Sequence, residues 1–171
     1  MSAALASVIL PPDRRQSATA LQVQRGVRRL FAELGHVTIP EFSLANGRRA
    51  DVIALCGAGK LTIVEIKSSV ADFRADRKWP DYRDFCDRFF FAIPEEVPES
   101  LIPEECGLIV ADAYGAELSR MAPAAKLAAA RRARVMAAPQ AEASVWLLAY
   151  HGRISSMTKP STCRRARPEA T

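Results

Sequence analysis

The sequence predicts a mixed α/β domain with a central sheet flanked by helices, and three observations support this class. Several short segments are rich in Val, Ile, Leu, Phe and Thr, as strands are. A segment with apolar residues at helical spacing precedes them, and segments rich in Ala and Arg follow them. Glycines and prolines stand between many of these segments, where turns are expected. This order of elements favours a layered arrangement of sheet and helices.

The N-terminal part predicts an arm, a helix and a strand. Residues 1–16 contain two adjacent prolines and are expected to form a flexible arm. Ser17 can cap the helix that follows, because apolar residues recur at helical spacing over residues 20–34 and Gly35 can end it. Gly26 is unfavourable inside a helix. A short strand is expected at residues 36–42.

Residues 48–67 predict a β-hairpin, which organises the rest of the chain. Its arms, residues 48–55 and 61–67, are rich in β-branched and aliphatic residues. Between them, Gly57 and Gly59 can supply the positive φ angles of a tight reversal. Because side chains alternate along a strand, Glu65 and Lys67 should share one face while Val64 and Ile66 point to the other.

The residues after the hairpin predict further strands joined by loops. Residues 68–88 mix acids, bases and aromatic rings and favour a loop or short turn leading into a helix that Pro80 would start. Residues 89–93 predict a buried strand ended by Pro94, followed by a connecting loop over residues 95–105. Residues 106–112 predict another strand, and residues 116–121 a short edge strand.

The C-terminal part is expected to be helical and then disordered. Residues 126–138 predict a helix that Pro139 stops, and residues 141–150 a second one, so residues 123–153 form a helical extension. Residues 154–171 are basic and have little that could form a core, which predicts a disordered tail. The main domain is therefore expected over residues 17–122.

Composition bounds the class of protein. The formal charge of +5 and the pI near 9.3 permit a polyanionic partner without requiring one. No apolar run approaches the length of a membrane span, and no basic segment precedes the short apolar patch at the N-terminus, so we expect a soluble, cytoplasmic protein with no membrane partner. The cysteines lack paired spacing and are expected to be reduced thiols: Cys56, Cys86, Cys106 and Cys163.

The hairpin carries the candidate chemistry. Asp51 stands near the head of one arm, opposite Glu65 and Lys67 on the other. Charged groups in so apolar a strand must be paired, solvated or bound to a ligand. Two carboxylates, with the backbone carbonyl of Ile66 as a third oxygen donor, suit Mg²⁺ (or Mn²⁺). Lys67 would orient water and contact a phosphate, so Asp51, Glu65 and Lys67 are the candidate catalytic residues of phosphodiester hydrolysis.

This pattern resembles the signature of the PD-(D/E)XK nucleases, with Ala50 in place of the proline. Four blocks resemble the MmcB family of bacterial DNA repair proteins more closely. They are residues 47–52, residues 64–69, residues 72–74 with 78–82, and residues 102–105 with 107–109. The resemblance covers roughly residues 18–132. It implies a restriction-endonuclease-like core in residues 17–122 and a role in tolerating DNA damage.

One departure from the superfamily bears on the number of metals. Resolvase-like members carry a glutamate on the first helix, whereas this chain has Gln24 and Arg25 in that neighbourhood. Glu33 lies beside the apolar stripe of this helix and could approach the site, although at a different helical position. The sequence therefore favours hydrolysis with one metal.

Other residues could contact nucleic acid, each with a structural alternative. Arginines before a strand can grip phosphate or simply be solvated, and aromatic rings can stack on bases or fix a loop to the core. His36 and His151 stand apart from any ligand pattern and are expected to have no catalytic part. The candidate nucleic-acid residues are Arg48, Arg49, Ser69, Lys78, Trp79 and Tyr82.

The leading hypothesis is a metal-dependent DNA endonuclease acting on damaged or branched DNA during repair. The alternative is a module that keeps the nuclease fold, cleaves nothing, and binds DNA or a repair partner. A third is a nuclease acting on RNA. A short match to the motif can also be charged decoration on a solvated sheet face. The sequence leaves open a homodimer and a repair-protein partner.

Overall fold

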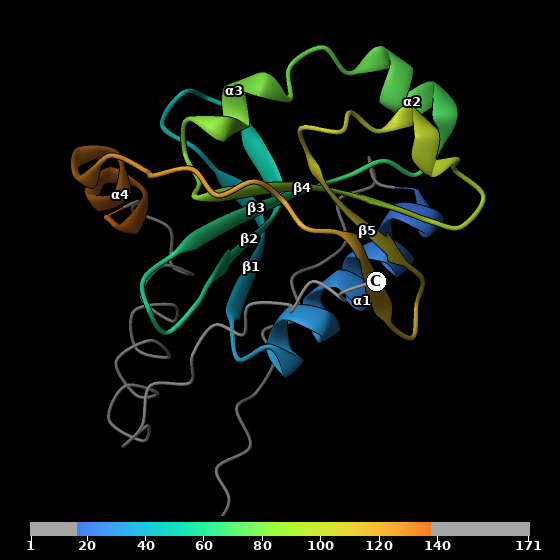
Figure 1. The fold of residues 1–171 in the computed structure, drawn as a ribbon, viewed down its shortest axis with the longest axis horizontal. Helices are drawn as coiled ribbons and strands as arrows, with labels where there is room; N and C mark the ends of the chain where they lie inside the picture. The colour runs from blue at the N-terminus through green and yellow to red at the C-terminus, as the bar shows by residue number, and fades with distance from the viewer. Residues whose placement is uncertain (1–16, 138–171) are drawn as a thin grey trace, which may run out of the picture.

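The computed structural model describes residues 17–137, which contain a six-stranded sheet with helices on both faces (Figure 1). The strands lie side by side in chain order. The pairs β1–β2, β2–β3 and β5–β6 are antiparallel, and β3–β4 and β4–β5 are parallel. The predicted mixed α/β class is confirmed. The strand bounds are β1 Val37–Ser43, β2 Arg49–Leu55, β3 Leu61–Ile66, β4 Arg88–Ile93, β5 Gly107–Ala111 and β6 Ala116–Arg120.

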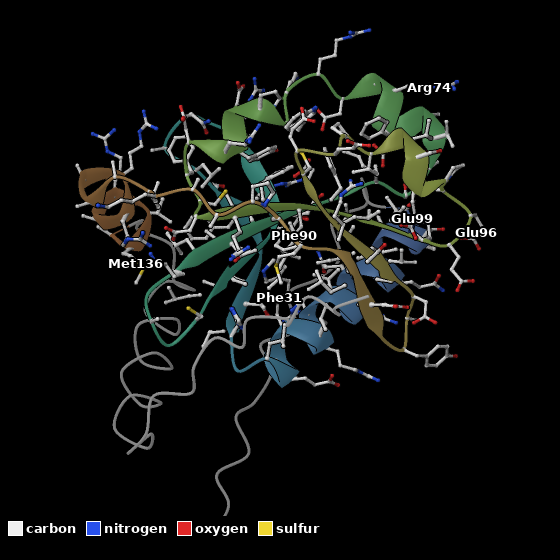
Figure 2. The ribbon with its side chains drawn as sticks, in the orientation of Figure 1. Phe31, Arg74, Phe90, Glu96, Glu99 and Met136 are labelled. Atoms are coloured by element: carbon white, nitrogen blue, oxygen red, sulfur yellow. The ribbon has the colours of Figure 1, made fainter. Side chains whose placement is uncertain are left out.

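Helix α1 (Ala18–Glu33) covers one face of the sheet. The Ser17 hydroxyl caps it by accepting a hydrogen bond from the backbone N–H of Ala20 at 3.1 Å, as the sequence predicts. Figure 2 shows Phe31 of α1 and Phe90 of β4 in the region where helix and sheet meet, and both belong to one buried cluster with Val64 and Ile66. The even-numbered side chains of β3 therefore fill the core under α1.

Gly26 lies on the buried side of α1, where the helix approaches the turn between β5 and β6. A Cβ atom at this position would collide with the carbonyl oxygens of Asp112 and Gly115. Arg29, one turn along, donates a hydrogen bond to the carbonyl of Tyr114 at 2.6 Å. Close packing thus explains a glycine that propensity alone disfavours.

The opposite face is covered by α2 (Val70–Ala75) and α3 (Pro80–Arg83), which lie above the sheet in Figure 1. Phe73 of α2 packs edge-on against Phe91 of β4, with ring centroids 5.5 Å apart. Odd-numbered side chains such as Ile63 and Phe89 fill this second core. A short 3₁₀ helix, η1 (Glu99–Leu101), interrupts the predicted loop between β4 and β5.

Helix α4 (Ala129–Met136) packs beside the β2–β3 turn. Leu127 and Val135 join the core cluster, and Asp87 accepts hydrogen bonds from Arg132 at 2.8 Å and from the backbone N–H of Leu61 at 2.8 Å. In the turn itself, Gly59 has a φ of +73° whereas Gly57 is outside the positive-φ region. One of the two expected glycines therefore makes the reversal.

The structure corrects the prediction for the charged segment after β3. Residues 68–79 are not a continuous loop, because Val70–Ala75 form α2, capped by Ser69, whose hydroxyl accepts from the N–H of Asp72 at 3.1 Å. The helix predicted to start at Pro80 exists but has four residues. The helix predicted over residues 126–138 is also confirmed, with shorter bounds.

Several predictions concern residues outside the described range. These are the arm at residues 1–16, the helix at residues 141–150 and the tail at residues 154–171. The division into a domain of residues 17–122 and an extension of residues 123–153 stays a prediction. Within the described range, Cys56, Cys86 and Cys106 are buried, free thiols. Among the helices of residues 17–137, none combines the length and apolar character needed to cross a membrane.

Candidate active site at the separation of two strands

The candidate site forms where β2 and β3 stop pairing. Their last backbone pair at this end joins Val52 to Val64, so Asp51 and Glu65 lie just beyond it. Past this point the backbone N–H of Ile66 donates to Oδ2 of Asp51 at 2.7 Å. The Asp51 carboxylate thus replaces a neighbouring strand as hydrogen-bond acceptor, which fixes the carboxylate beside Glu65.

Glu65 and Lys67 lie on the face of β3 opposite α1, as the alternation along the strand predicts. Glu65 is 8% exposed and Lys67 is 4% exposed, so neither is surface decoration. Lys67 Nζ is 3.4 Å from Glu65 Oε1 and 2.7 Å from Oδ2 of Asp76, the residue that follows α2. The structure therefore brings the predicted Asp51, Glu65 and Lys67 together and adds a third acid.

Burial and mutual repulsion raise the pKa values of the two carboxyl groups. Burial raises the pKa of Asp51 to about 6, although the hydrogen bond from Ile66 opposes this change. Burial, and then the charge of Asp51, raise the pKa of Glu65 to about 8. At neutral pH and without a cation, the pair of carboxyl groups therefore holds a proton.

Lys67 is held in its charged form. Burial lowers the pKa of its amine, but the carboxylates of Glu65 and Asp76 outweigh burial and the pKa rises. Asp76 responds in the opposite direction: burial raises its pKa, but the hydrogen bonds from Lys67 and from the backbone N–H of Lys78 outweigh this and lower it. Lys67 is consequently a hydrogen-bond donor and a positive charge rather than a base.

The oxygens of the site fit a hard cation. Asp51 Oδ2 is occupied by Ile66 N–H and Glu65 Oε1 faces Lys67, whereas Glu65 Oε2 is buried with no hydrogen-bond partner among the described residues. An orphaned buried oxygen beside a second carboxylate is what a divalent cation would satisfy. Within residues 17–137, no set of three or more Asp, Glu, His or Cys residues is arranged to hold a metal. Asp51 and Glu65 would therefore hold it together with non-side-chain oxygens, among which the Ile66 carbonyl stays a prediction.

Glu41 is a further acid near the site that the sequence did not indicate. The register of β1 and β2 pairs Pro40 with Val52 and Phe42 with Ala50, which leaves Glu41 opposite Asp51. It is the non-glycine residue with a positive φ, +53°, in the described range. Its charge contributes to the raised pKa of Asp51, and its Oε2 is 2.7 Å from Nε of Arg49.

The polar residues predicted to contact nucleic acid lie around this site with protein partners of their own. Arg48 pairs with Asp81 at 2.8 Å, and Arg49 pairs with Glu41. The hydroxyl of Ser69 caps α2, which accounts for this residue structurally. The side chain of Lys78 is exposed. Their contact with nucleic acid stays a prediction.

The two aromatic rings of the same prediction pack against the core. Tyr82 is 6% exposed, its hydroxyl donates to the carbonyl of Arg49 at 3.0 Å, and its ring stacks on Phe89. Trp79 is half-buried and stacks on Phe89 as well, with a centroid distance of 5.9 Å. The structure therefore favours the alternative in which these rings fix the α2–α3 segment to the sheet. Contact of either ring with a base stays a prediction.

The remaining candidates lie away from the site. Glu33 is exposed at the last position of α1, the helix that covers the other face of the sheet. His36 packs edge-on against Phe31, with centroids 5.3 Å apart. His151 lies outside the described residues. Asp76, in contrast, is a site residue that sequence reasoning missed; the Ser69–Asp72 spacing could have revealed α2, but no local pattern links Asp76 to Lys67.

Comparisons with known proteins identify relatives of the chain. The family model described as "DNA repair protein MmcB-like" matches residues 9–151. A solved structure of a protein of unknown function from Silicibacter pomeroyi is 42% identical, with a TM-score of 0.71, and the match covers 81% of this chain and 94% of that one. A search of the curated proteins finds no match.

A second solved structure is similar at a much lower level. It is a repair endonuclease from Pyrococcus abyssi, 16% identical with a TM-score of 0.34. The match covers 53% of this chain and 43% of that chain. This likeness is too slight to define a shared fold.

Proposed function

Because the chain belongs to the MmcB-like family of DNA repair proteins, we propose that its acidic site makes it a metal-dependent DNA endonuclease. One observation carries the proposal: two carboxylates and one ammonium group meet at the end of the β2–β3 ladder, and Glu65 Oε2 is buried there without a partner among the described residues. A solvated, decorative charge cluster would not bury a glutamate to 8% exposure. The substrate class is damaged or branched DNA.

Asp51 and Glu65 are the residues that would hold the cation, Mg²⁺ or Mn²⁺. When bound, such an ion supplies a water of lowered pKa and neutralises charge that develops on the phosphate. Asp51 is prepared for this role because the N–H of Ile66 fixes one of its oxygens at 2.7 Å. Glu65 would give up the proton that its raised pKa retains at neutral pH.

Lys67 is suited to stabilise the transition state. It is buried, fully charged and held by Asp76 at 2.7 Å, so little reorganisation is needed when negative charge develops nearby. A cationic lysine in this place can donate to a non-bridging phosphate oxygen or orient the attacking water. The raised pKa of its amine favours this role of donor over that of a base.

Basic side chains near the site supply the groups that a DNA backbone requires. Lys78 is exposed just after Asp76, and Arg48 is partly exposed with a surface partner, Asp81. An ion pair of this kind can exchange its carboxylate for a phosphate at little cost, because exposed pairs contribute only about 0–1 kcal/mol. Binding through these groups would weaken as salt rises.

The test is cleavage of supercoiled, branched and crosslinked DNA by the purified full chain with Mg²⁺ or Mn²⁺. The variant Asp51→Asn should abolish cutting while its circular dichroism and DNA binding stay those of the wild type. Asp84→Asn is the matched control, because Asp84 is exposed and pairs with Arg131 at 2.9 Å. It should cut normally.

Cutting that survives Asp51→Asn would refute the proposal. If the wild-type chain binds branched DNA in a salt-sensitive way and cuts none of the DNAs, the protein is instead a binding module with a nuclease-like site. Selective cutting of RNA in the same assay would reassign the substrate.

A further inference from the structure

The ammonium group of Lys67 is shared unequally between two carboxylates. The distance to Asp76 Oδ2, 2.7 Å, is that of a close ion pair, whereas the distance to Glu65 Oε1, 3.4 Å, is at the limit of a hydrogen bond. All three side chains are largely buried. Asp76 is therefore the principal partner of Lys67.

Asp76 is itself fixed by the backbone around it. Its Oδ1 accepts from the N–H of Lys78 at 2.7 Å, and its own N–H donates to the carbonyl of Phe73 at 3.2 Å where α2 ends. Phe73 is anchored in turn against Phe91 of β4. The Asp76 carboxylate is thus held in place as a partner for Lys67.

From this arrangement we propose that Asp76 is a positioning residue that draws the Lys67 ammonium away from Glu65, leaving Glu65 Oε2 free for a divalent cation. The proposal rests on the proposed nuclease function and names a residue that supports the same site. Without Asp76, the nearest carboxylate to Lys67 would be Glu65, and an ammonium paired closely with Glu65 would compete with a cation for it.

A structural role for the pair makes different predictions. An ion pair that merely ties α2 to the sheet would affect stability, and α2 already has another attachment to the sheet. Phe73 of α2 packs against Phe91 of β4, with ring centroids 5.5 Å apart. A positioning role instead requires that loss of Asp76 change metal affinity and turnover through Lys67.

The experiment measures Mn²⁺ affinity by titration calorimetry, and kcat and KM for DNA cleavage, in the full chain. Asp76→Asn should weaken Mn²⁺ affinity and lower kcat by about tenfold or more, the usual effect of removing a partner of a site residue, with KM little changed. Asp76→Glu should retain part of the wild-type Mn²⁺ affinity and part of the wild-type kcat. Asp84→Asn, which removes an exposed carboxylate from an ion pair, should change neither.

Comparing the effect of Asp76→Asn in the wild-type chain and in a Lys67→Gln chain shows whether Asp76 acts through Lys67. In a Lys67→Gln chain, Asp76→Asn should have no further effect on Mn²⁺ affinity, since the ammonium that it positions is gone. Equal losses in both backgrounds would overturn the proposal. So would wild-type affinity and kcat in Asp76→Asn.

A readout that needs neither metal nor DNA separates this inference from the proposed function. The Lys67 Nζ signal in side-chain NMR should shift and broaden in Asp76→Asn and stay unchanged in Asp84→Asn. An unchanged signal in Asp76→Asn would overturn the positioning role. If the signal changes but the wild type neither binds Mn²⁺ nor cuts DNA, the nuclease proposal fails while Asp76 remains the residue that orients Lys67.

Discussion

Replacing Glu65 by glutamine tests whether the buried carboxyl group of Glu65 destabilises the folded protein when no cation is bound. The pKa of Glu65 rises from its ordinary value of 4.5 to about 8 because of burial and the charge of Asp51. Between these two pH values the unfolded chain loses the glutamate proton while the folded protein keeps it. The unfolded state therefore binds fewer protons, and the free energy of unfolding falls as pH rises through this window.

The magnitude follows from the width of the window. Each pH unit corresponds to about 1.4 kcal/mol, so up to about 4 kcal/mol of stability is lost by about pH 7.5. The glutamine side chain of the variant would be neutral at every pH and would resemble the protonated glutamate. We therefore expect Glu65→Gln to be more stable than the wild type by about 2–4 kcal/mol near pH 7.5, and about equally stable near pH 4.5. For a chain of this size the gain amounts to a Tm rise of about 6–12 °C.

The assay is thermal unfolding of both chains at the two pH values, with and without Mn²⁺. A cation that binds only the folded state should raise the Tm of the wild type and leave that of Glu65→Gln unchanged. Glu96→Gln is the control, because Glu96 is an exposed carboxylate on the loop after β4 (Figure 2). Equal Tm values for wild type and Glu65→Gln at both pH values would refute a buried, protonated Glu65, and an equal Mn²⁺ effect would refute its role as a ligand.

Three further predictions concern the metal and the packing of the helices. The apparent affinity for Mn²⁺ should rise with pH between about 6 and 8, because binding must displace protons from carboxyl groups of raised pKa. Calorimetry in buffers of different ionisation enthalpy measures the protons released, and an affinity that does not depend on pH would contradict this prediction. Gly26→Ala should lower the free energy of unfolding measured in urea by about 1–3 kcal/mol, because the added Cβ meets two backbone carbonyls. The control Ala32→Gly, on the exposed side of α1, should lower it by about 1 kcal/mol or less. Asp87→Asn should lower the free energy of unfolding by about 2–3 kcal/mol at neutral pH, since Arg132 loses its charged partner. This difference in stability should shrink as pH falls through the lowered pKa of Asp87. A difference that does not depend on pH would point to packing alone.

The hairpin and the charged trio could be predicted because both follow from local rules. Alternation along a strand places Glu65 and Lys67 on one face wherever the strand lies, and a hairpin places Asp51 across from them. What the pattern could not specify is that the ladder stops at Val52 and Val64, so that Asp51 bonds to Ile66 rather than facing solvent. That depends on how two strands separate, which no residue type signals.

Asp76 and Tyr82 show where sequence reasoning stops. The contact between Lys67 and Asp76 requires α2 to turn the chain back over β3, and a helix of six residues has little propensity signal of its own. For Tyr82, composition allowed either a base-stacking ring or a core ring. Burial favours the core ring, because the ring stacks on Phe89 and its hydroxyl donates to the Arg49 carbonyl.

Asp51 has two roles, and the choice of substitution must separate them. Its carboxylate is both a candidate metal ligand and the acceptor for the otherwise unpaired N–H of Ile66. Asp51→Ala would remove both, and the N–H left without an acceptor would cost about 1–3 kcal/mol, so lost activity could reflect lost structure. Asp51→Asn keeps an acceptor oxygen and removes the charge. We therefore expect Asp51→Asn to unfold within about 1 kcal/mol of the wild type near pH 4, where the Asp51 carboxyl group of the folded protein is protonated, and Asp51→Ala to unfold at least about 1 kcal/mol more easily. Both variants should lose Mn²⁺ binding at neutral pH. Urea unfolding and calorimetry on the two variants check this, and equal stability of the alanine and asparagine variants would show that the bond to Ile66 contributes nothing.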